Sequence, residues 1–138
     1  MGLKDKAGKM VLIVEDDKDI NALIAYNLYK EGFSVESVYD GLQAQERVLK
    51  RHFDVVILDI MLPGLDGFSV CQAIRKRKGS HKTLVIMVSA KAEEHDKMYA
   101  YLLGADCYLT KPFSVGKLLE VVRDFNALRA REYTVEVN

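Results

Sequence analysis

Residues 55–67 read VVILDIMLPGLDG, in which four apolar residues are followed by an aspartate and a loop. Apolar runs of the same kind recur at Val11–Val14 and Leu84–Val88. All three runs are short and rich in β-branched residues, which is typical of strands buried on both faces. Strands of this kind belong in a parallel sheet, so the three runs predict the centre of the fold.

Two weaker segments, Phe33–Val38 and Cys107–Thr110, mix polar and apolar residues, as strands near the edge of a sheet do. Helical patterns lie between the strands. The first helix is predicted by an apolar stripe at three- and four-residue spacing, formed by Ile20, Leu23, Ile24 and Leu28. Gly32 follows as its stop. Further helices are expected to start near Gly41, Asp66 and Ala92.

The last helix carries a similar stripe, and its end beyond Leu128 is left open. The stripe consists of Val115, Leu118, Leu119, Val122 and Phe125. Strand and helix thus alternate strictly along the chain. With right-handed crossovers, this alternation predicts an α/β, doubly wound, flavodoxin-like sheet of five parallel strands in the order 2-1-3-4-5, with helices on both faces.

Length and composition favour one soluble domain. A chain of 138 residues with 49% hydrophobic residues can bury one self-supporting core. We expect an N-terminal tail at residues 1–9, the domain at 10–130, and a C-terminal tail or the start of a linker at 131–138. Cys71 and Cys107 lie in apolar patterns without metal-ligand spacing, which predicts two reduced core thiols.

Charge and hydropathy exclude two classes of partner. The formal net charge is zero, so no global field attracts the chain to nucleic acid or anionic lipid. No apolar run approaches the ~18 residues of a membrane span, and the first nine residues lack the apolar segment of a signal peptide. These observations predict a cytoplasmic protein that binds neither membrane nor nucleic acid directly.

Acidic residues follow two of the central strands. In doubly wound sheets, ligands bind beyond the carboxyl ends of the strands, where the strand order reverses. Glu15, Asp16 and Asp17 follow the first strand, and Asp59 follows the third. Carboxylates gathered at one place raise one another's pKa unless a cation neutralises them. Because all the donors are hard oxygens without a nearby His or Cys, the cation expected here is Mg²⁺.

The same edge also carries groups that bind phosphate. Ser89 follows the fourth strand and Lys111 follows the fifth. Three aspartates bring three negative charges, and Mg²⁺ with Lys111 brings three positive ones, so the site is formally neutral. Each residue alone is equally well a helix cap or a solvated charge. Together at one edge they favour phosphoryl transfer, which requires positioning and charge neutralisation.

Four motifs, in this order and spacing, resemble the receiver domain of two-component response regulators over residues 10 to about 128. They are VLIVEDD, VVILDIMLPGLDG, VIMVSA and GADCYLTKPF. The resemblance implies that Asp59 is the phosphoacceptor and Asp17 a direct Mg²⁺ ligand. Asp16 would be a direct or water-mediated ligand, and the backbone carbonyl of Met61 would complete the protein's contribution.

The resemblance also assigns roles to the later motifs. Ser89 and Lys111 would hold the phosphoryl oxygens. Tyr108 would be an aromatic switch that turns inward when Ser89 moves, although a half-buried aromatic on an edge strand is a comparable interpretation of the residue itself. The Lys111–Pro112 peptide would be cis.

The implied function is phosphorelay signalling. A sensor histidine kinase or a histidine phosphotransfer protein would donate the phosphoryl group, and the only catalysis would be the domain's own phosphoryl transfer and autodephosphorylation. The output partner or effector domain is not encoded in these residues. Output is expected on the face formed by the helix near Ala92, the strand Cys107–Thr110 and the last helix.

A charged dimer of the winged-helix type is not expected. That subgroup would require an acid, a glutamate and an arginine where this chain has Cys107, Lys117 and Val121. A monomer, a weak dimer or a differently arranged dimer is therefore predicted.

Other functions are less well supported by the residues. A pseudo-receiver that acts only by binding partners stays an alternative. An aspartate-nucleophile phosphatase would need a second aspartate where this chain has Met61. A dinucleotide or flavin module would need a glycine-rich turn after the first strand, where the chain has EDDKD.

Overall fold

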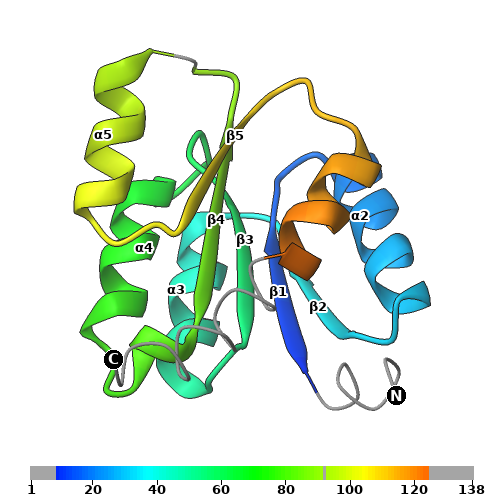
Figure 1. Cartoon of the computed structure of the whole chain (residues 1–138). Coiled ribbons are helices and arrows are strands. Elements are labelled where there is room, and N and C mark those ends of the chain that lie inside the picture. The colour runs from blue at the N-terminus through cyan, green and yellow to red at the C-terminus, as the bar shows by residue number, and fades with distance from the viewer. Residues whose placement is uncertain (1–8, 92, 125–138) are drawn as a thin grey trace, which may run out of the picture.

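The computed structural model describes residues 9–91 and 93–124, which form a parallel sheet with helices on both faces (Figure 1). The sheet has five strands in the order β2-β1-β3-β4-β5. They are β1 (Met10–Val14), β2 (Ser34–Val38), β3 (Val55–Asp59), β4 (Leu84–Ser89) and β5 (Cys107–Thr110). The predicted strand order is confirmed, and the two strands of mixed composition are the edges.

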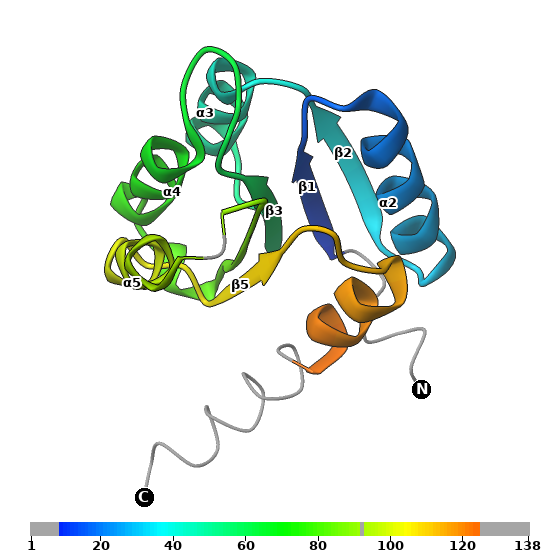
Figure 2. The ribbon, with the colours of Figure 1, turned by 90° about the horizontal axis from the view of Figure 1, so that it is seen from above.

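The helices divide between the two faces of the sheet. They are α2 (Lys18–Lys30), α3 (Gly41–Lys50), α4 (Gly67–Lys76), α5 (Glu94–Leu102) and a helical segment at residues 115–124, with a short 3₁₀ turn, η1 (Ser80–Lys82). Seen from above, α3, α4 and α5 cover one face, and α2 with segment 115–124 covers the other (Figure 2). The doubly wound arrangement predicted from the sequence is therefore confirmed.

Aspartates begin three of the helices. Asp17, Asp40 and Asp66 are the N-caps of α2, α3 and α4, and each side chain accepts a backbone N–H of the first turn. Gly32, with a φ of 101°, follows the end of α2 as predicted. Helix α5 begins at Glu94, whereas the predicted start at residue 92 lies outside the described residues, as do Phe125 and Leu128.

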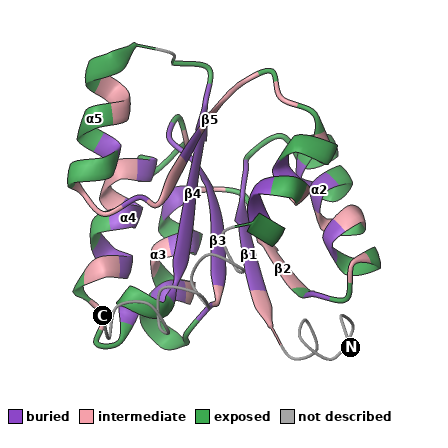
Figure 3. Cartoon of the chain, viewed as in Figure 1, coloured by how far each residue is buried: buried purple, intermediate pink, exposed green. Residues whose placement is uncertain are grey.

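The core consists of two layers of side chains that alternate along the strands. On β1, Leu12 and Val14 belong to the layer beneath α3, α4 and α5, whereas Val11 and Ile13 belong to the layer beneath α2 and segment 115–124. The same alternation runs through β3 and β4, and both of these strands are buried throughout (Figure 3). Burial on both faces explains why these strands read as continuous apolar runs.

The predicted apolar stripe of the first helix was wrong at two positions. Ile24 and Leu28 are buried, but Ile20 and Leu23 are 37% and 52% exposed. The third buried residue of α2 is Asn21, whose side-chain amide donates to two main-chain carbonyls. These hydrogen bonds compensate for burying a polar side chain. Helix α2 therefore presents Asn21 to the core, while the neighbouring Ile20 is exposed.

The remaining predictions on domain limits and cysteines have separate outcomes. Cys71 is buried and Cys107 half-buried, both as free thiols, and burial raises the pKa of Cys71 to about 11. Within residues 9–91 and 93–124, no helix has the length and apolar character that a membrane crossing requires. The domain limits at residues 10 and 130 stay predictions: β1 begins at Met10, and residue 130 lies outside the described part.

Candidate functional site

Three carboxylates meet at the carboxyl ends of β1 and β3. These strands are neighbours in the sheet, so the residues that follow or end them lie at the same edge. Glu15, Asp16 and Asp59 each place one carboxylate oxygen so that the three atoms lie within 4.8 Å of one another. Glu15 and Asp59 are buried, and Asp16 is exposed.

Lys111 lies between two of these acids. Its Nζ is 2.7 Å from Glu15 Oε1 and 2.7 Å from Asp59 Oδ2. Lys111 follows β5, and its peptide bond to Pro112 is cis, which confirms that prediction. Burial lowers the pKa of Lys111, but its hydrogen bonds to Asp59 and Glu15 outweigh burial and leave the pKa raised. The ammonium is therefore fixed in its charged form.

Glu15 is the residue of this site that the sequence reasoning left without a role. Its Oε1 accepts from Lys111 and its Oε2 accepts the backbone N–H of Asp17. Burial raises the pKa of Glu15, and the nearby charge of Asp59 adds to this rise, while the bonds to Lys111 and Asp17 oppose it. Within the described part of the chain, Lys111 is the cation that pairs with this buried carboxylate.

The structure places Asp17 at the start of α2 and not in this carboxylate group. Asp17 Oδ1 accepts the backbone N–H groups of Asp19 and Ile20, at 3.0 and 3.1 Å. The signal for this position was present in the sequence, because an aspartate immediately before the first helical residue is a typical N-cap. The acid that lies with Asp16 and Asp59 is thus Glu15. That Asp17 binds a metal directly stays a prediction.

Both carboxylate oxygens of Asp59 have a partner within the chain. Oδ2 accepts from Lys111, and Oδ1 accepts the backbone N–H of Met61 at 3.0 Å. Asp59 is 4% exposed, while the Met61 side chain projects into solvent. The carboxylate therefore has a fixed orientation at the end of β3. That the Met61 carbonyl binds a metal stays a prediction.

Glycines hold the loop between β3 and α4 close to the rest of the fold. The N–H of Gly41 donates to the carbonyl of Pro63 at 3.1 Å, and a Cβ at Gly41 would collide with the carbonyl of Leu65. A Cβ at Gly67 would collide with the carbonyl of Asp59. Larger residues would displace this backbone, so the two glycines keep the loop in contact with β3.

Ser89 and Tyr108 meet at the backbone of Lys91. Ser89 is buried at the end of β4, and its Oγ accepts the Lys91 N–H at 3.1 Å. The Tyr108 hydroxyl donates to the Lys91 carbonyl at 2.8 Å. Tyr108 is 8% exposed, so its ring lies inward, and burial is the main cause that raises its pKa. Ser89 and Tyr108, which were predicted to form a switch, therefore both bond to the backbone of Lys91.

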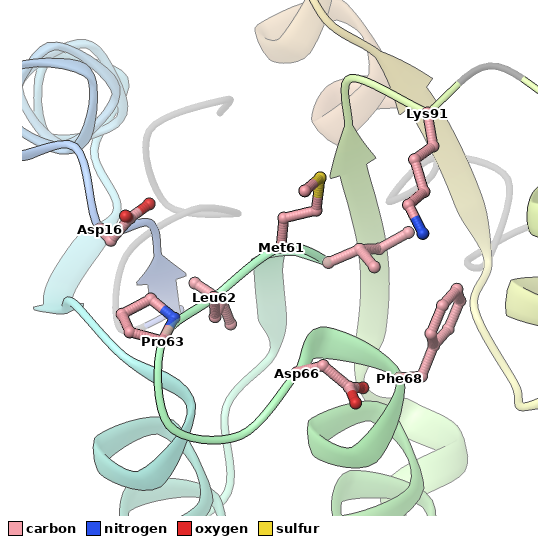
Figure 4. Close-up of a pocket in the computed structure, with 8 residues that line it drawn as sticks. Asp16, Met61, Leu62, Pro63, Asp66, Phe68 and Lys91 are labelled. Atoms are coloured by element: carbon pink, nitrogen blue, oxygen red, sulfur yellow. The ribbon is translucent and has the colours of Figure 1, made fainter.

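A cleft of about 470 Å³ opens beside Asp16. Figure 4 shows Asp16 on one side, the loop from Met61 to Asp66 beneath it, and Lys91 on the other side. Apolar side chains of Leu62, Pro63 and Phe68 form much of its wall. Asp16, the exposed member of the carboxylate group, thus lines a cleft that has the Lys91 ammonium on its other side.

The charges at this edge do not balance without a cation. Glu15, Asp16 and Asp59 carry three negative charges, and Lys111 carries one positive charge, which leaves two negative charges. One divalent ion would neutralise them, and three hard oxygen donors are the ligand type that Mg²⁺ prefers. A second acidic group, Glu93, His95 and Asp96, lies in the first turn of α5 and just before it, and two of its members are exposed.

Comparison with known proteins identifies a family and solved structures with the same fold. The family model described as "Response regulator receiver domain" matches residues 11–123. The receiver domain of a Francisella response regulator is 33% identical, with a TM-score of 0.76, covering 84% of this chain and 94% of that one. A receiver domain from Methanospirillum hungatei is 28% identical, with a TM-score of 0.81, covering 90% and 98%.

A third solved structure bears on the metal. The receiver domain of a sensor histidine kinase from Pseudomonas aeruginosa is 30% identical to this chain, with a TM-score of 0.76, covering 86% of this chain and 97% of that one. It is described with a magnesium ion coordinated in its active-site cleft.

Proposed function

From the premise that this chain belongs to the response regulator receiver domain family of two-component systems, we propose that it accepts a phosphoryl group on Asp59 and thereby switches an output surface. One observation carries the proposal. The Asp59 carboxylate ends a central strand, is held by Lys111 and the Met61 N–H, and lies with Glu15 and Asp16 in one group. A carboxylate so placed is an oriented nucleophile beside positive charge.

The transfer itself is a displacement at phosphorus. An Asp59 oxygen forms the new P–O bond while the P–N bond to a donor imidazole breaks, and the electron pair of that bond returns to the nitrogen. Lys111 already bridges Glu15 and Asp59, so its ammonium lies where negative charge on the transferred group develops. Ser89 lies at the end of the next strand and supplies a hydroxyl at the same edge.

Mg²⁺ fits the donor set of this edge. We assign it to Asp16, Asp59 and the carbonyl of Met61, with Glu15 as a direct or water-mediated partner. Asp17 is left out of this set because its carboxylate caps α2. When bound, the ion would neutralise the charge that accumulates on the phosphoryl oxygens. The magnesium described in the Pseudomonas receiver domain supports this choice.

The donor is another protein that carries a phosphohistidine. None of the chain's three histidines belongs to the carboxylate group of Glu15, Asp16 and Asp59 in the described part of the chain. A sensor histidine kinase or a histidine phosphotransfer protein fits the family. Two free thiols suit a reducing compartment, so we place the domain in the cytoplasm.

The output surface is assigned to α5, β5 and the segment 115–124. Tyr108 and Ser89 meet at Lys91, just before α5, so a rearrangement at the site reaches this helix first. Met98, Tyr101 and Leu102 project from α5 and offer apolar contact area. Val121 is buried in the core and cannot contact a second copy, which supports a monomer or a differently arranged dimer over the winged-helix type.

Phosphorylation with a small-molecule donor tests the proposal. Acetyl phosphate and Mg²⁺ should add one phosphoryl group to the protein, detected by intact mass, and Asp59→Asn should abolish the addition because the nucleophile is gone. Asp66→Asn is the matched control: Asp66 lines the same cleft but caps α4, and asparagine caps equally well. EDTA should suppress labelling of the wild type.

Two results would assign another function. Equal phosphoryl uptake by wild type and Asp59→Asn would exclude Asp59, and no uptake by either would indicate a pseudo-receiver that only binds partners. Repeated turnover of added phosphoesters would indicate a phosphatase, for which the chain has Met61 where a second acid is needed.

A further inference from the structure

Asn21 is a buried polar residue of α2 that lies against the first strand's end. It is 1% exposed, and its Nδ2 donates to the carbonyl of Glu15 at 3.0 Å and to the carbonyl of Val38 at 3.1 Å. Its Oδ1 is buried and accepts no hydrogen bond from any described residue. An asparagine that leaves one acceptor unpaired is a poor choice for core packing, because leucine has a similar volume and no polar atoms.

The two carbonyls that Asn21 joins belong to neighbouring strands at the point where their pairing stops. The ladder between β1 and β2 ends at Val14 and Val38, and one more backbone bond runs from the Glu15 N–H to the Val38 carbonyl. The chain then leaves β2, and the Tyr39 N–H turns to the side chain of Gln43. The side-chain amide of Asn21 thus joins β1 and β2 just beyond their last backbone hydrogen bond.

With the bond from Asn21, every polar group of Glu15 has a hydrogen-bond partner. Its N–H donates to Val38, its Oε1 accepts from Lys111 and its Oε2 accepts from Asp17. Its carbonyl is held by Asn21. Because that carbonyl belongs to the peptide unit that joins Glu15 to Asp16, the bond from Asn21 sets the plane from which Asp16 projects.

Asp16 has no such restraint of its own. Its side chain is exposed, and within residues 9–91 and 93–124 no hydrogen bond or ion pair holds its carboxylate. Its place in the carboxylate group therefore depends on the backbone that precedes it. Resting on the function proposed above, we propose that Asn21 is a positioning residue that aims the Asp16 carboxylate at the Mg²⁺ site by clamping the Glu15–Asp16 peptide to β2.

The matched control lies six residues along the same helix. Asn27 also donates its Nδ2 to a carbonyl, that of Leu23, but this bond stays within α2 and does not reach the sheet. Asn21→Leu and Asn27→Leu therefore make the same chemical change on one helix. Only the first of them removes a contact to the peptide before Asp16.

Mg²⁺ titration of the wild type and the variants tests this role. Asn21→Leu should raise the Kd for Mg²⁺ about tenfold, as the loss of a residue that orients a metal ligand does, and should recover its phosphorylation rate at saturating Mg²⁺. In the metal-free protein, the Asp17 amide should exchange its hydrogen faster, while the thermal midpoint stays close to that of wild type. Asn27→Leu should change none of these. Asn21→Ala gives the same comparison with a smaller side chain.

Wild-type Mg²⁺ affinity in a folded Asn21→Leu or Asn21→Ala variant would overturn the role of Asn21. If neither variant folds, the wild type decides: Mg²⁺ should shift the side-chain amide resonances of Asn21 and leave those of Asn27 in place, and unmoved Asn21 resonances would exclude the role. A wild type that takes up neither Mg²⁺ nor phosphoryl groups would instead contradict the proposed function itself.

Discussion

The two ends of the sheet use polar side chains in opposite ways. At the amino end, the residue before each of three strands bonds to the backbone of a neighbouring strand or loop. Asp54 Oδ2 accepts the N–H of Met10, Thr83 Oγ1 donates to the carbonyl of Phe53, and Asp106 Oδ2 accepts the N–H of Val85. At the carboxyl end, Glu15, Asp16 and Asp59 face one another across the end of the sheet.

Arg75 completes the amino end. Its guanidinium donates to the carbonyls of Gly104, Ser80 and Thr83 and pairs with Asp106. One cation thus joins α4, η1, the start of β4 and the turn before β5. Lys111 is its counterpart at the carboxyl end, but the Lys111 ammonium pairs with two carboxylates and, in the described residues, donates to no backbone group.

This difference separates stability from function. Polar groups that are satisfied by backbone partners hold the fold together and have little left to bind a ligand. Like charges that are buried together cost stability and persist where a ligand is to be bound. The amino end should therefore govern unfolding, and the carboxyl end should govern Mg²⁺ and phosphoryl uptake.

The largest effect is expected at the amino end. Arg75→Met should lower the free energy of unfolding by about 2–4 kcal/mol, because Asp106 and three carbonyls lose a charged donor in a partly buried site. Urea unfolding measures the loss. Mg²⁺ affinity of the folded variant should equal that of wild type, and Lys76→Met, on the exposed side of the same helix, is the control. A large loss of Mg²⁺ affinity in Arg75→Met would show that the two ends are coupled.

An effect of intermediate size is expected when Asp16 and Asp17 are compared for their contribution to Mg²⁺ binding. At about 100 times the wild-type Kd, Mg²⁺ should stabilise the wild type by about 2.7 kcal/mol, and a tenfold weaker site in Asp16→Asn should keep only about 1.4 kcal/mol of this. Asp17→Asn should keep the full stabilisation, since asparagine caps α2 as well as aspartate does. Thermal unfolding with and without Mg²⁺ is the measurement. Loss of the Mg²⁺ effect in Asp17→Asn would instead support Asp17 as the metal ligand, as the sequence predicted.

The smallest effect is expected at Glu15. Its pKa is raised in the folded protein, so the fold binds the Glu15 proton more tightly than the unfolded chain does. Stability from Glu15 is therefore present below its ordinary pKa of about 4.5 and is lost as pH rises through the raised value. In metal-free protein at pH 7, Glu15→Gln should raise the thermal midpoint by roughly a few degrees, with the difference vanishing in acid.

The opposite order of the two thermal midpoints would also be informative. A lower midpoint of metal-free Glu15→Gln at pH 7 would show that the bond to Lys111 outweighs burial. With Mg²⁺ present, the order of the two proteins should reverse, because the wild type has the additional carboxylate for the ion.

The sequence was sufficient for the architecture because burial on both faces leaves a direct mark on composition. The strand beginning at Met10 is apolar throughout, and those beginning at Val55 and Leu84 are apolar up to their last residue. Aspartates before Gly41 and Gly67 mark two helix starts. Asp16, Asp59, Ser89 and Lys111 could be placed at one edge of the sheet for the same reason, since each lies at the end of a recognisable strand or immediately beyond one.

Two parts of the site could not be found in this way. Choosing among Glu15, Asp16 and Asp17 requires knowing at which residue the strand ends and the helix begins, and apolar periodicity leaves that boundary uncertain by a residue or two. Asn21 was missed because the helical stripe was assigned by apolar residues alone. A polar side chain that is buried by bonding to backbone carbonyls leaves no mark in such a pattern.

The place of β1 in the sheet also has a consequence for synthesis of the chain. The strand that is made first ends up between β2 and β3, so it cannot be covered on both sides until both have been made. Residues up to Val38 suffice for one neighbour, and until Val55–Asp59 has left the ribosome the other side of β1 is an open strand edge. Asp59 is the last residue of the strand that closes this edge, so Glu15 and Asp16 at the end of β1 meet Asp59 only when the sheet around them is complete.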